Sequence, residues 1–227
     1  MALAVLRGDV PGDVRGDFDA LRRAAELAKP VTLAGERSLP VLDALEPLLP
    51  VGIRRGVVAS VDGGPGATLL ALALSAATSR EGSWVALVGA PSVGLLTAGE
   101  VGLALERVLV VADPPERSVA TVVAALLDTV DVVYVRAPNL TASDARRLVA
   151  RAREREAVLV PLGRWPLGAD VRLSVASPEW SGLTGCGAGR LTARRVRVVA
   201  SGKGVYARER SASLWLPDET GAVSCAT

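Results

Sequence analysis

The chain has 227 residues, half of them apolar, and its formal net charge at neutral pH is +2. This length supports one domain with a full core, and no apolar run approaches the roughly eighteen residues of a membrane span. The sequence has no histidine, and its two cysteines, Cys186 and Cys225, predict neither a disulfide framework nor a metal site. We therefore expect a cytoplasmic protein without a metal, in which any catalysis would depend on carboxylates or backbone groups.

The first 50 residues predict an N-terminal helical appendage. Residues 18–28 have helical periodicity, which a proline ends. A second short helix is expected over residues 41–48, between Pro40 and Pro50.

From Gly56 onward, short apolar runs alternate with amphipathic stretches, which is typical of βαβ units around a parallel sheet. The expected strands are 56–61, 83–88, 107–111, 131–135, 157–161 and 171–175. The expected helices are 67–78, 95–104, 119–129 and 143–156. The pattern predicts an α/β fold, a mostly parallel twisted sheet with helices on both faces, and a core domain spanning residues 51–188.

The pattern changes near residue 188. Residues 190–199 alternate apolar and polar side chains, a turn follows at residues 201–204, and residues 205–216 predict one or two further strands. We expect an antiparallel β-hairpin region over residues 189–216 that closes the edge of the sheet. The remaining residues, 217–227, have little to pack and are expected to form a flexible tail, or a partner-binding segment that folds on contact.

A glycine-rich turn between the first strand and helix of this core resembles a phosphate-binding loop. A working loop has the pattern G-x-x-x-x-G-K-[ST], in which the lysine reaches the phosphates and the hydroxyl holds Mg²⁺. Gly66 and Thr68 are in place, but Val61 takes the first glycine position and Ala67 the lysine position. We expect the architecture of a nucleotide-binding turn to survive without ATP turnover; the alternative is a plain glycine/proline turn. The residues of this vestigial site are Gly63, Gly64, Gly66 and Thr68.

Four further segments, in unbroken order, are similar to motifs of the RecA core. Residues 52–58 resemble G-[IL]-P-x-G-x-[IV], which leads into the first strand, and residues 101–110 resemble L-G-V-D-x-x-x-L-x-V. Residues 130–135 resemble the Walker B strand, and residues 169–173 the late A-S-V-R-L strand. The chain therefore resembles the RecA-like fold over residues 38–200.

The resemblance also implies that the nucleotide site is eroded. Arg136 stands where the Walker B strand should end in a metal-organising aspartate, and Gly89 begins the segment that should carry the catalytic acid. Loss of the lysine, the metal carboxylate and the acid removes most of what catalyses phosphoryl transfer, so we expect no ATPase activity and no bound ATP. Arg136 either pairs with Asp62 or Glu100 across the vestigial site or points to solvent.

Two long DNA-binding loops of RecA-like recombinases are also short here. Residues 136–142 and 163–169 are all that remain of them, so strand exchange is not expected, and any DNA contact would not use RecA-type loops.

With these features the chain resembles the ImuA group of RecA-like pseudo-ATPases, in its actinobacterial form. The resemblance implies an accessory role in DNA-damage-induced (SOS-type) mutagenesis and DNA repair by translesion synthesis. The implied partners are an ImuB-type polymerase homologue, an error-prone DnaE-type polymerase and RecA. Residues 1–37 are a candidate self-association element, because RecA-type cores assemble through an N-terminal segment.

Two other functions stay open. One is a SulA-like division inhibitor that binds FtsZ. The other is a nucleotide-dependent DNA-binding ATPase that completes its site with groups from a neighbouring subunit.

Basic residues concentrate in the C-terminal hairpin region with few carboxylates beside them, which makes them candidates for contact with phosphate or an acidic partner. They are Arg190, Arg194, Arg195, Arg197, Arg208 and Arg210. The arginines of the expected helix 143–156 are instead interleaved with carboxylates, which predicts an ordinary solvated face.

Overall fold

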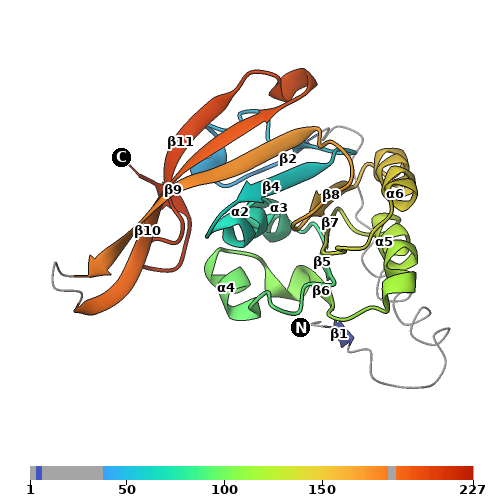
Figure 1. Ribbon diagram of the computed structural model, residues 1–227, viewed down its shortest axis with the longest axis horizontal. Helices are drawn as coiled ribbons and strands as arrows, with labels where there is room; N and C mark the ends of the chain where they lie inside the picture. Colours follow the sequence, from blue (N-terminus) through green and yellow to red (C-terminus); the bar gives the residue numbers. More distant parts are fainter. Residues whose placement is uncertain (1–3, 7–37, 184–187, 227) are drawn as a thin grey trace.

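The computed structural model describes residues 4–6, 38–183 and 188–226 (Figure 1). A parallel five-stranded sheet forms one part of the molecule. Its strands, in spatial order, are β1 (Ala4–Leu6), β6 (Val108–Val111), β5 (Val85–Val88), β7 (Val132–Val135) and β8 (Val158–Pro161). All four pairings are parallel, as the continuously apolar runs predict for strands covered on both faces.

A second five-stranded sheet is mixed and continues the first. Its strands, in spatial order, are β12 (Ser224–Cys225), β11 (Arg210–Trp215), β10 (Gly189–Gly202), β9 (Val171–Leu183) and β4 (Ala59–Gly63). Only β4 and β9 pair in parallel. Parallel bridges from Val58 to Leu159 and from Val61 to Leu162 join β4 to β8. A short antiparallel pair, β2 (Ser38–Leu39) and β3 (Ile53–Arg54), lies beside this array.

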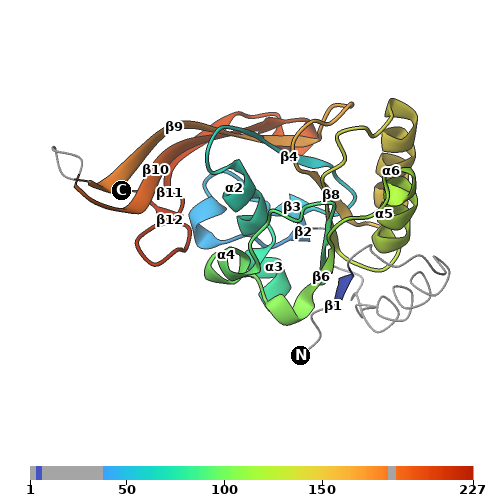
Figure 2. The ribbon, with the colours of Figure 1, turned by 60° about the horizontal axis from the view of Figure 1, so that its bottom comes forward.

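Helices cover both faces of the parallel sheet (Figure 2). One face packs against α2 (Ala67–Ala73), α3 (Ala76–Arg80) and α4 (Leu95–Glu100), and the other against α5 (Val119–Leu127) and α6 (Ala142–Glu154). The described residues also form four single 3₁₀ turns: η1 (Asp43–Leu45), η2 (Leu105–Arg107), η3 (Glu116–Ser118) and η4 (Gly204–Tyr206). Within β5, Val85 and Leu87 contact the first group, whereas Ala86 and Val88 contact the second. The predicted α/β fold, with a C-terminal antiparallel extension, is confirmed.

Helix bounds differ from the prediction where polar or glycine residues intervene. The helix expected over residues 67–78 is two helices, and Ser75 lies between them with its hydroxyl 2.8 Å from the Tyr134 hydroxyl. Tyr134 in turn donates to the carbonyl of Ala71 at 2.6 Å, and its burial raises the pKa of the phenol far above the ordinary value. The helix expected over 95–104 ends at Glu100, because Gly102 adopts a left-handed φ of 103°.

The prediction of an N-terminal appendage over residues 1–50 needs correction. Residues 38–54 contribute buried side chains to the main core, among them Leu39, Leu45, Leu48, Leu49 and Ile53. Their local structure is a 3₁₀ turn, not the helix expected over 41–48, and β1 adds a parallel strand to the sheet. The helix expected over 18–28 lies outside the described residues, as does nearly all of the proposed self-association element.

The segment after Pro217 also packs more than expected. β12 pairs with β11, and Val223 is buried in the main core. Asp218 organises the loop between them, because its carboxylate accepts bonds from the N–H groups of Thr220 at 2.9 Å and Ala222 at 3.1 Å. The hydroxyls of Thr220 and Ser224 also donate to it. Residues 217–226 therefore form a structured end, which corrects the expectation of a segment with little to pack.

Replacing Asp218 with alanine should lower the free energy of unfolding by about 1–2 kcal/mol at pH 7, because two backbone donors lose their acceptor. Burial raises the pKa of Asp218, but the bonds from Thr220, Ser224 and Ala222 outweigh it and hold the pKa below its usual value. The contribution of the ionised carboxylate is thus complete above the unfolded pKa of about 4 and is lost as the pH falls through the folded pKa.

Urea unfolding of wild type and Asp218→Ala at pH 7, 5 and 3 measures this. The difference should shrink toward the acid end, whereas the exposed neighbour Glu219, replaced with alanine, should change stability little at any pH. A difference for Asp218→Ala that stays constant with pH would contradict the role of the charge.

Within the ranges described, no helix is long and apolar enough to cross a membrane. No group of His, Cys, Asp and Glu side chains that could hold a metal is found in the same part of the chain.

Candidate functional site

The glycine-rich turn at the end of β4 is shorter than a phosphate-binding loop. β4 stays extended through Gly63, and its register with β9 pairs Asp62 with Ser174 and Gly63 with Val175. Two residues that would curve around an anion in a working loop therefore belong to a sheet. The connection to α2 consists of residues 64–66 alone, closed by the Ala67 N–H bond to the Gly64 carbonyl at 3.2 Å. The prediction that the loop architecture survives is thus corrected, because strand pairing absorbs its first part.

Arg194 of β10 lies against this turn. Its side chain is buried, its Nε donates to the carbonyl of Leu216 at 2.7 Å, and its guanidinium carbon lies 4.8 Å from the centre of the Trp180 ring. Gly66 has a φ of 111°, and a Cβ there would lie 2.8 Å from a terminal nitrogen of Arg194. Burial lowers the pKa of the guanidinium from its usual value. The arginine that contacts Gly66 of this turn therefore comes from a distant strand and is already hydrogen bonded to the protein.

A cavity of about 400 Å³ lies between this turn, α4 and the C-terminal segment. Gly66 and Thr68 line it, whereas Gly63 lies within the strand and Gly64 is exposed outside it. Its charged lining residues are one arginine, Arg194, and one carboxylate, Glu100. A triphosphate needs an excess of positive charge, which a lining with one charge of each sign does not supply.

Arg136 does not enter that cavity. It follows β7, is half-buried, and lines a separate cavity of about 700 Å³. In the described ranges it pairs with neither predicted carboxylate: Asp62 forms an ion pair with Arg172 at 3.1 Å, and Glu100 lies at the first cavity. Neither predicted alternative for Arg136, an ion pair across the vestigial site or a side chain that points to solvent, describes its position.

The six arginines of the C-terminal region do not form one patch. Arg195 and Arg197 are exposed on one face of β10, opposite Trp215 and Ser213 of β11. Arg194 faces the interior instead. The others lie at two ends of the sheet, with Arg190 near the start of β10 and Arg208 and Arg210 near the start of β11. In the part of the chain that the structure describes, none of the six is in an ion pair with a carboxylate.

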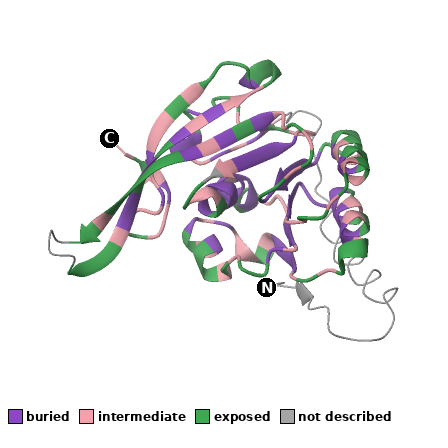
Figure 3. Ribbon diagram, viewed as in Figure 1, coloured by how far each residue is buried: buried purple, intermediate pink, exposed green. Residues whose placement is uncertain are grey.

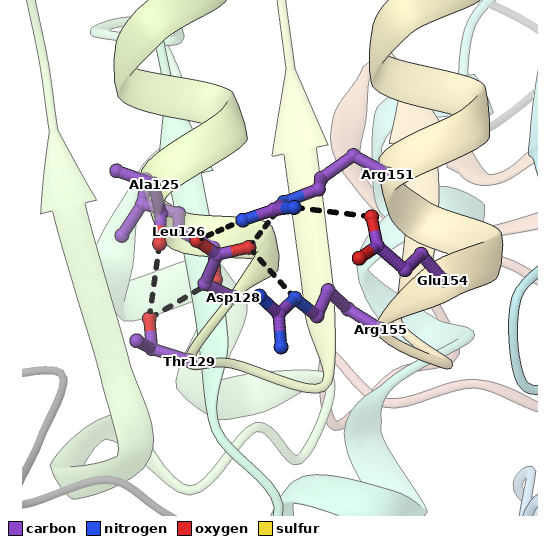
Figure 4. A network of polar contacts seen from close by, with 7 residues as sticks. All are labelled: Ala125, Leu126, Asp128, Thr129, Arg151, Glu154 and Arg155. Carbon is purple, nitrogen blue, oxygen red and sulfur yellow. Dashed lines mark hydrogen bonds and ion pairs between the residues drawn. The ribbon is translucent and has the colours of Figure 1, made fainter.

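Three arginines of α6, by contrast, form ion pairs with carboxylates, namely Arg147, Arg151 and Arg153. Figure 4 shows the contacts around Arg151. Arg151 donates to Asp128, at the end of α5, with Nη2 2.7 Å from Oδ2, and also to Glu154 at 3.0 Å. The bond to Asp128 raises the pKa of Arg151. Arg155 reaches Asp128 as well, at 3.2 Å. This face of α6 is a surface ion-pair network, with little free charge for a partner.

A feature that the sequence pattern did not predict is the length of β9 and β10. Beyond the body of the sheet they continue as a two-stranded ribbon of residues 176–183 and 189–193, called here the β9–β10 arm (Figure 1). Its side chains are largely exposed (Figure 3), including the large apolar residues Trp180, Leu183 and Leu191. A register shift between β9 and β10, with Ser177 at a φ of 50°, bends the ribbon where it leaves the sheet. Pro178 and this bulge make the strand hard to recognise in the sequence, where Trp180 and Leu183 are isolated apolar residues among serine, glycine and threonine.

Proteins similar to this chain include members of a described family, a mycobacterial relative and a solved structure. The family model described as the MT3502 N-terminal domain matches residues 47–167. "Uncharacterized protein Rv3395c" of Mycobacterium tuberculosis (strain ATCC 25618 / H37Rv) is 33% identical over 168 residues, which cover 70% of this chain and 80% of the relative. The crystal structure of the RadB recombinase matches with a TM-score of 0.59 and 14% identity, covering 82% of this chain and 97% of that chain, a likeness that shows the fold. The chain therefore has a RecA-like fold and belongs to the MT3502 N-terminal domain family.

Proposed function

We propose that this protein is a non-catalytic RecA-like scaffold that acts in DNA-damage-induced, error-prone translesion synthesis in the cytoplasm. The observation that carries the non-catalytic part is the connection between β4 and α2. Strand pairing holds Asp62 and Gly63 in the sheet, and Arg194 packs on Gly66, which supports the loss of an ATPase's phosphate-binding loop.

The residue types at this turn support the same reading. Ala67 offers no cation to a phosphate, and Arg136, in place of a metal-binding carboxylate, lines a different cavity. Phosphoryl transfer depends on positioning and electrostatic stabilisation, which these substitutions remove together.

The β9–β10 arm is the surface that best fits a protein partner. Trp180, Leu183 and Leu191 are exposed on it, and large apolar side chains of this kind are typical anchors of interfaces. β10 pairs with one edge of β9 along the arm, whereas β4 pairs with the other edge only as far as Val175. Among the described strands, none pairs with that second edge beyond Val175, so it is open to a further strand. Arg195 and Arg197 lie on the adjoining sheet face without carboxylate partners, which favours an acidic binding segment.

The identity of the partners rests on the resemblance to the ImuA group. It supports an ImuB-type polymerase homologue as the first partner and an error-prone DnaE-type polymerase as the second, with RecA as a further candidate. A scaffold would join the two polymerases without chemistry of its own.

Binding of the purified full chain to purified ImuB-type and DnaE-type proteins of the same host tests this. We expect wild type to bind at least one of them, and the triple variant Trp180→Glu, Leu183→Glu, Leu191→Glu to lose at least about tenfold in affinity. The control is Leu96→Glu, which adds a charge at a leucine on α4 that is more exposed than the three arm residues and should leave binding unchanged.

Four results would overturn parts of the proposal. Binding to neither polymerase removes the translesion role, and binding to FtsZ instead supports a SulA-like division inhibitor. Micromolar affinity for Mg²⁺-ATP with measurable turnover supports an ATPase. Equal loss in the arm variant and in Leu96→Glu would show that the arm is not the docking surface.

A further inference from the structure

The larger of the two cavities described above, of about 700 Å³, lies where β5, β6 and β7 end. β5 lies between β6 and β7, and the chain leaves β5 toward α4 on one face but leaves β7 toward α6 on the other. In open α/β sheets such a divergence of connections opens a crevice at the carboxyl ends of the strands, where ligands bind. The volume is that of a small-molecule site.

Arg136 is held firmly at this crevice. Its N–H donates to the carbonyl of Val88 at 2.9 Å, directly after β7. On the adjacent strand, Gly89 has a φ of 66°, and a Cβ there would lie 2.4 Å from the Arg136 carbonyl oxygen. The backbones of Gly89 and Arg136 therefore approach as closely as a glycine allows. This contact fixes the position of the Arg136 backbone, from which the side chain extends.

The guanidinium of Arg136 has unused hydrogen-bonding capacity. Its Nε is buried and has no hydrogen-bond partner in the described structure. Buried donors in folded proteins nearly always have an acceptor, and an unsatisfied donor on a charged group is especially costly. An oxyanion bound in the cavity would supply that acceptor.

The carboxylates of the same cavity are engaged elsewhere or lie at its rim. Glu116 accepts from the side-chain amide of Asn139 at 2.7 Å. Asp144 accepts from Thr141 at 2.7 Å and lies 3.7 Å from Arg147, and Asp113 is exposed. In the described part of the chain Arg136 has no carboxylate partner. The first turns of α5 and α6 also border the cavity, and their dipoles add to a field that favours negative charge.

We propose that this cavity binds a small molecule bearing a phosphate or carboxylate group, with Arg136 as its anchor. A guanidinium suits both groups because it can donate two parallel bonds to two oxygens of one oxyanion. The hydroxyl of Thr121 also lines the cavity and can contact the rest of the ligand, whereas Asn139 and Thr141 already donate to Glu116 and Asp144. This inference does not depend on the proposed scaffold role.

Calorimetry with the full chain tests it, using inorganic phosphate, AMP and citrate as probes. We expect at least one probe to bind, Arg136→Gln to weaken it at least tenfold, and Thr121→Trp to abolish it by filling the cavity from an exposed position on α5. Arg146→Gln is the matched control, because Arg146 is exposed on α6 outside the cavity lining and should leave affinity unchanged.

Phosphate and citrate distinguish the two oxyanions, and AMP tests whether a larger phosphate ligand gains affinity. Absence of binding by all three probes to wild type overturns the proposal, as does equal affinity of wild type, Arg136→Gln and Thr121→Trp. A single-stranded oligonucleotide that binds through Arg136 while the small probes fail would overturn it in favour of a nucleic-acid contact. If Arg136→Gln does not fold, Thr121→Trp carries the test.

Discussion

Replacing Asp131 with alanine will lower the free energy of unfolding by about 3–5 kcal/mol, because it leaves the largely buried charge of Arg55 without a partner. The Asp131 side chain is 1% exposed and accepts from Arg55 Nη1 at 2.7 Å and from the N–H of Trp84 at 3.0 Å. Arg55 is 11% exposed, and its Nε already has no hydrogen-bond partner in the described structure. Without the carboxylate, its guanidinium is left without its counter-charge.

Chemical denaturation at neutral pH measures this effect, and two controls identify its cause. Replacing both partners, with Arg55→Met and Asp131→Leu, should restore much of the loss, because a pair of apolar side chains leaves no charge buried. Asp128→Ala should cost about 1 kcal/mol or less, although Asp128 contacts two arginines (Figure 4), because that pair is exposed to solvent. A loss at Asp131 no larger than that at Asp128 would contradict the argument from burial.

Leu45→Ala should lower the free energy of unfolding by about 2–5 kcal/mol, as expected when a fully buried leucine leaves a cavity. Leu45 lies in η1 and is 0% exposed, packed in the core that also contains α2 and both sheets. Leu96, 77% exposed on α4, is the matched control, and its replacement with alanine should change stability by less than about 0.5 kcal/mol.

The result at Leu45 tests the packing of residues 38–54 in the main core. A loss near that of Leu96→Ala would contradict this packing and would return these residues to the role of an appendage.

The central part of the fold could be predicted from sequence because its strands are covered on both faces. Such strands are continuously apolar, so the runs at 85–88, 108–111, 132–135 and 158–161 fall inside the predicted ranges. β1 and the β9–β10 arm could not be predicted, for different reasons. β1 has three residues, too few for a periodicity, and the β9–β10 arm is exposed, so no buried face imposes a pattern on it.

The candidate sites, too, could be predicted from the sequence only in part. Residue identity alone revealed the missing lysine at Ala67 and the arginine at position 136. It could not reveal that β4 continues through Gly63, because glycine is a poor strand residue and the pairing with β9 provides the reason. The contact of Arg194 with Gly66, and the cavity beside Arg136, form only when distant strands come together.

The extension of β4 limits what a single substitution at the turn can achieve. Ala67→Lys would restore the lysine of the phosphate-loop pattern. Asp62 and Gly63 would still pair with β9, and Arg194 would still pack on Gly66, so the backbone around that lysine would keep its present course. An engineered nucleotide site would therefore need a shorter β4 and a smaller side chain at position 194 as well as the lysine.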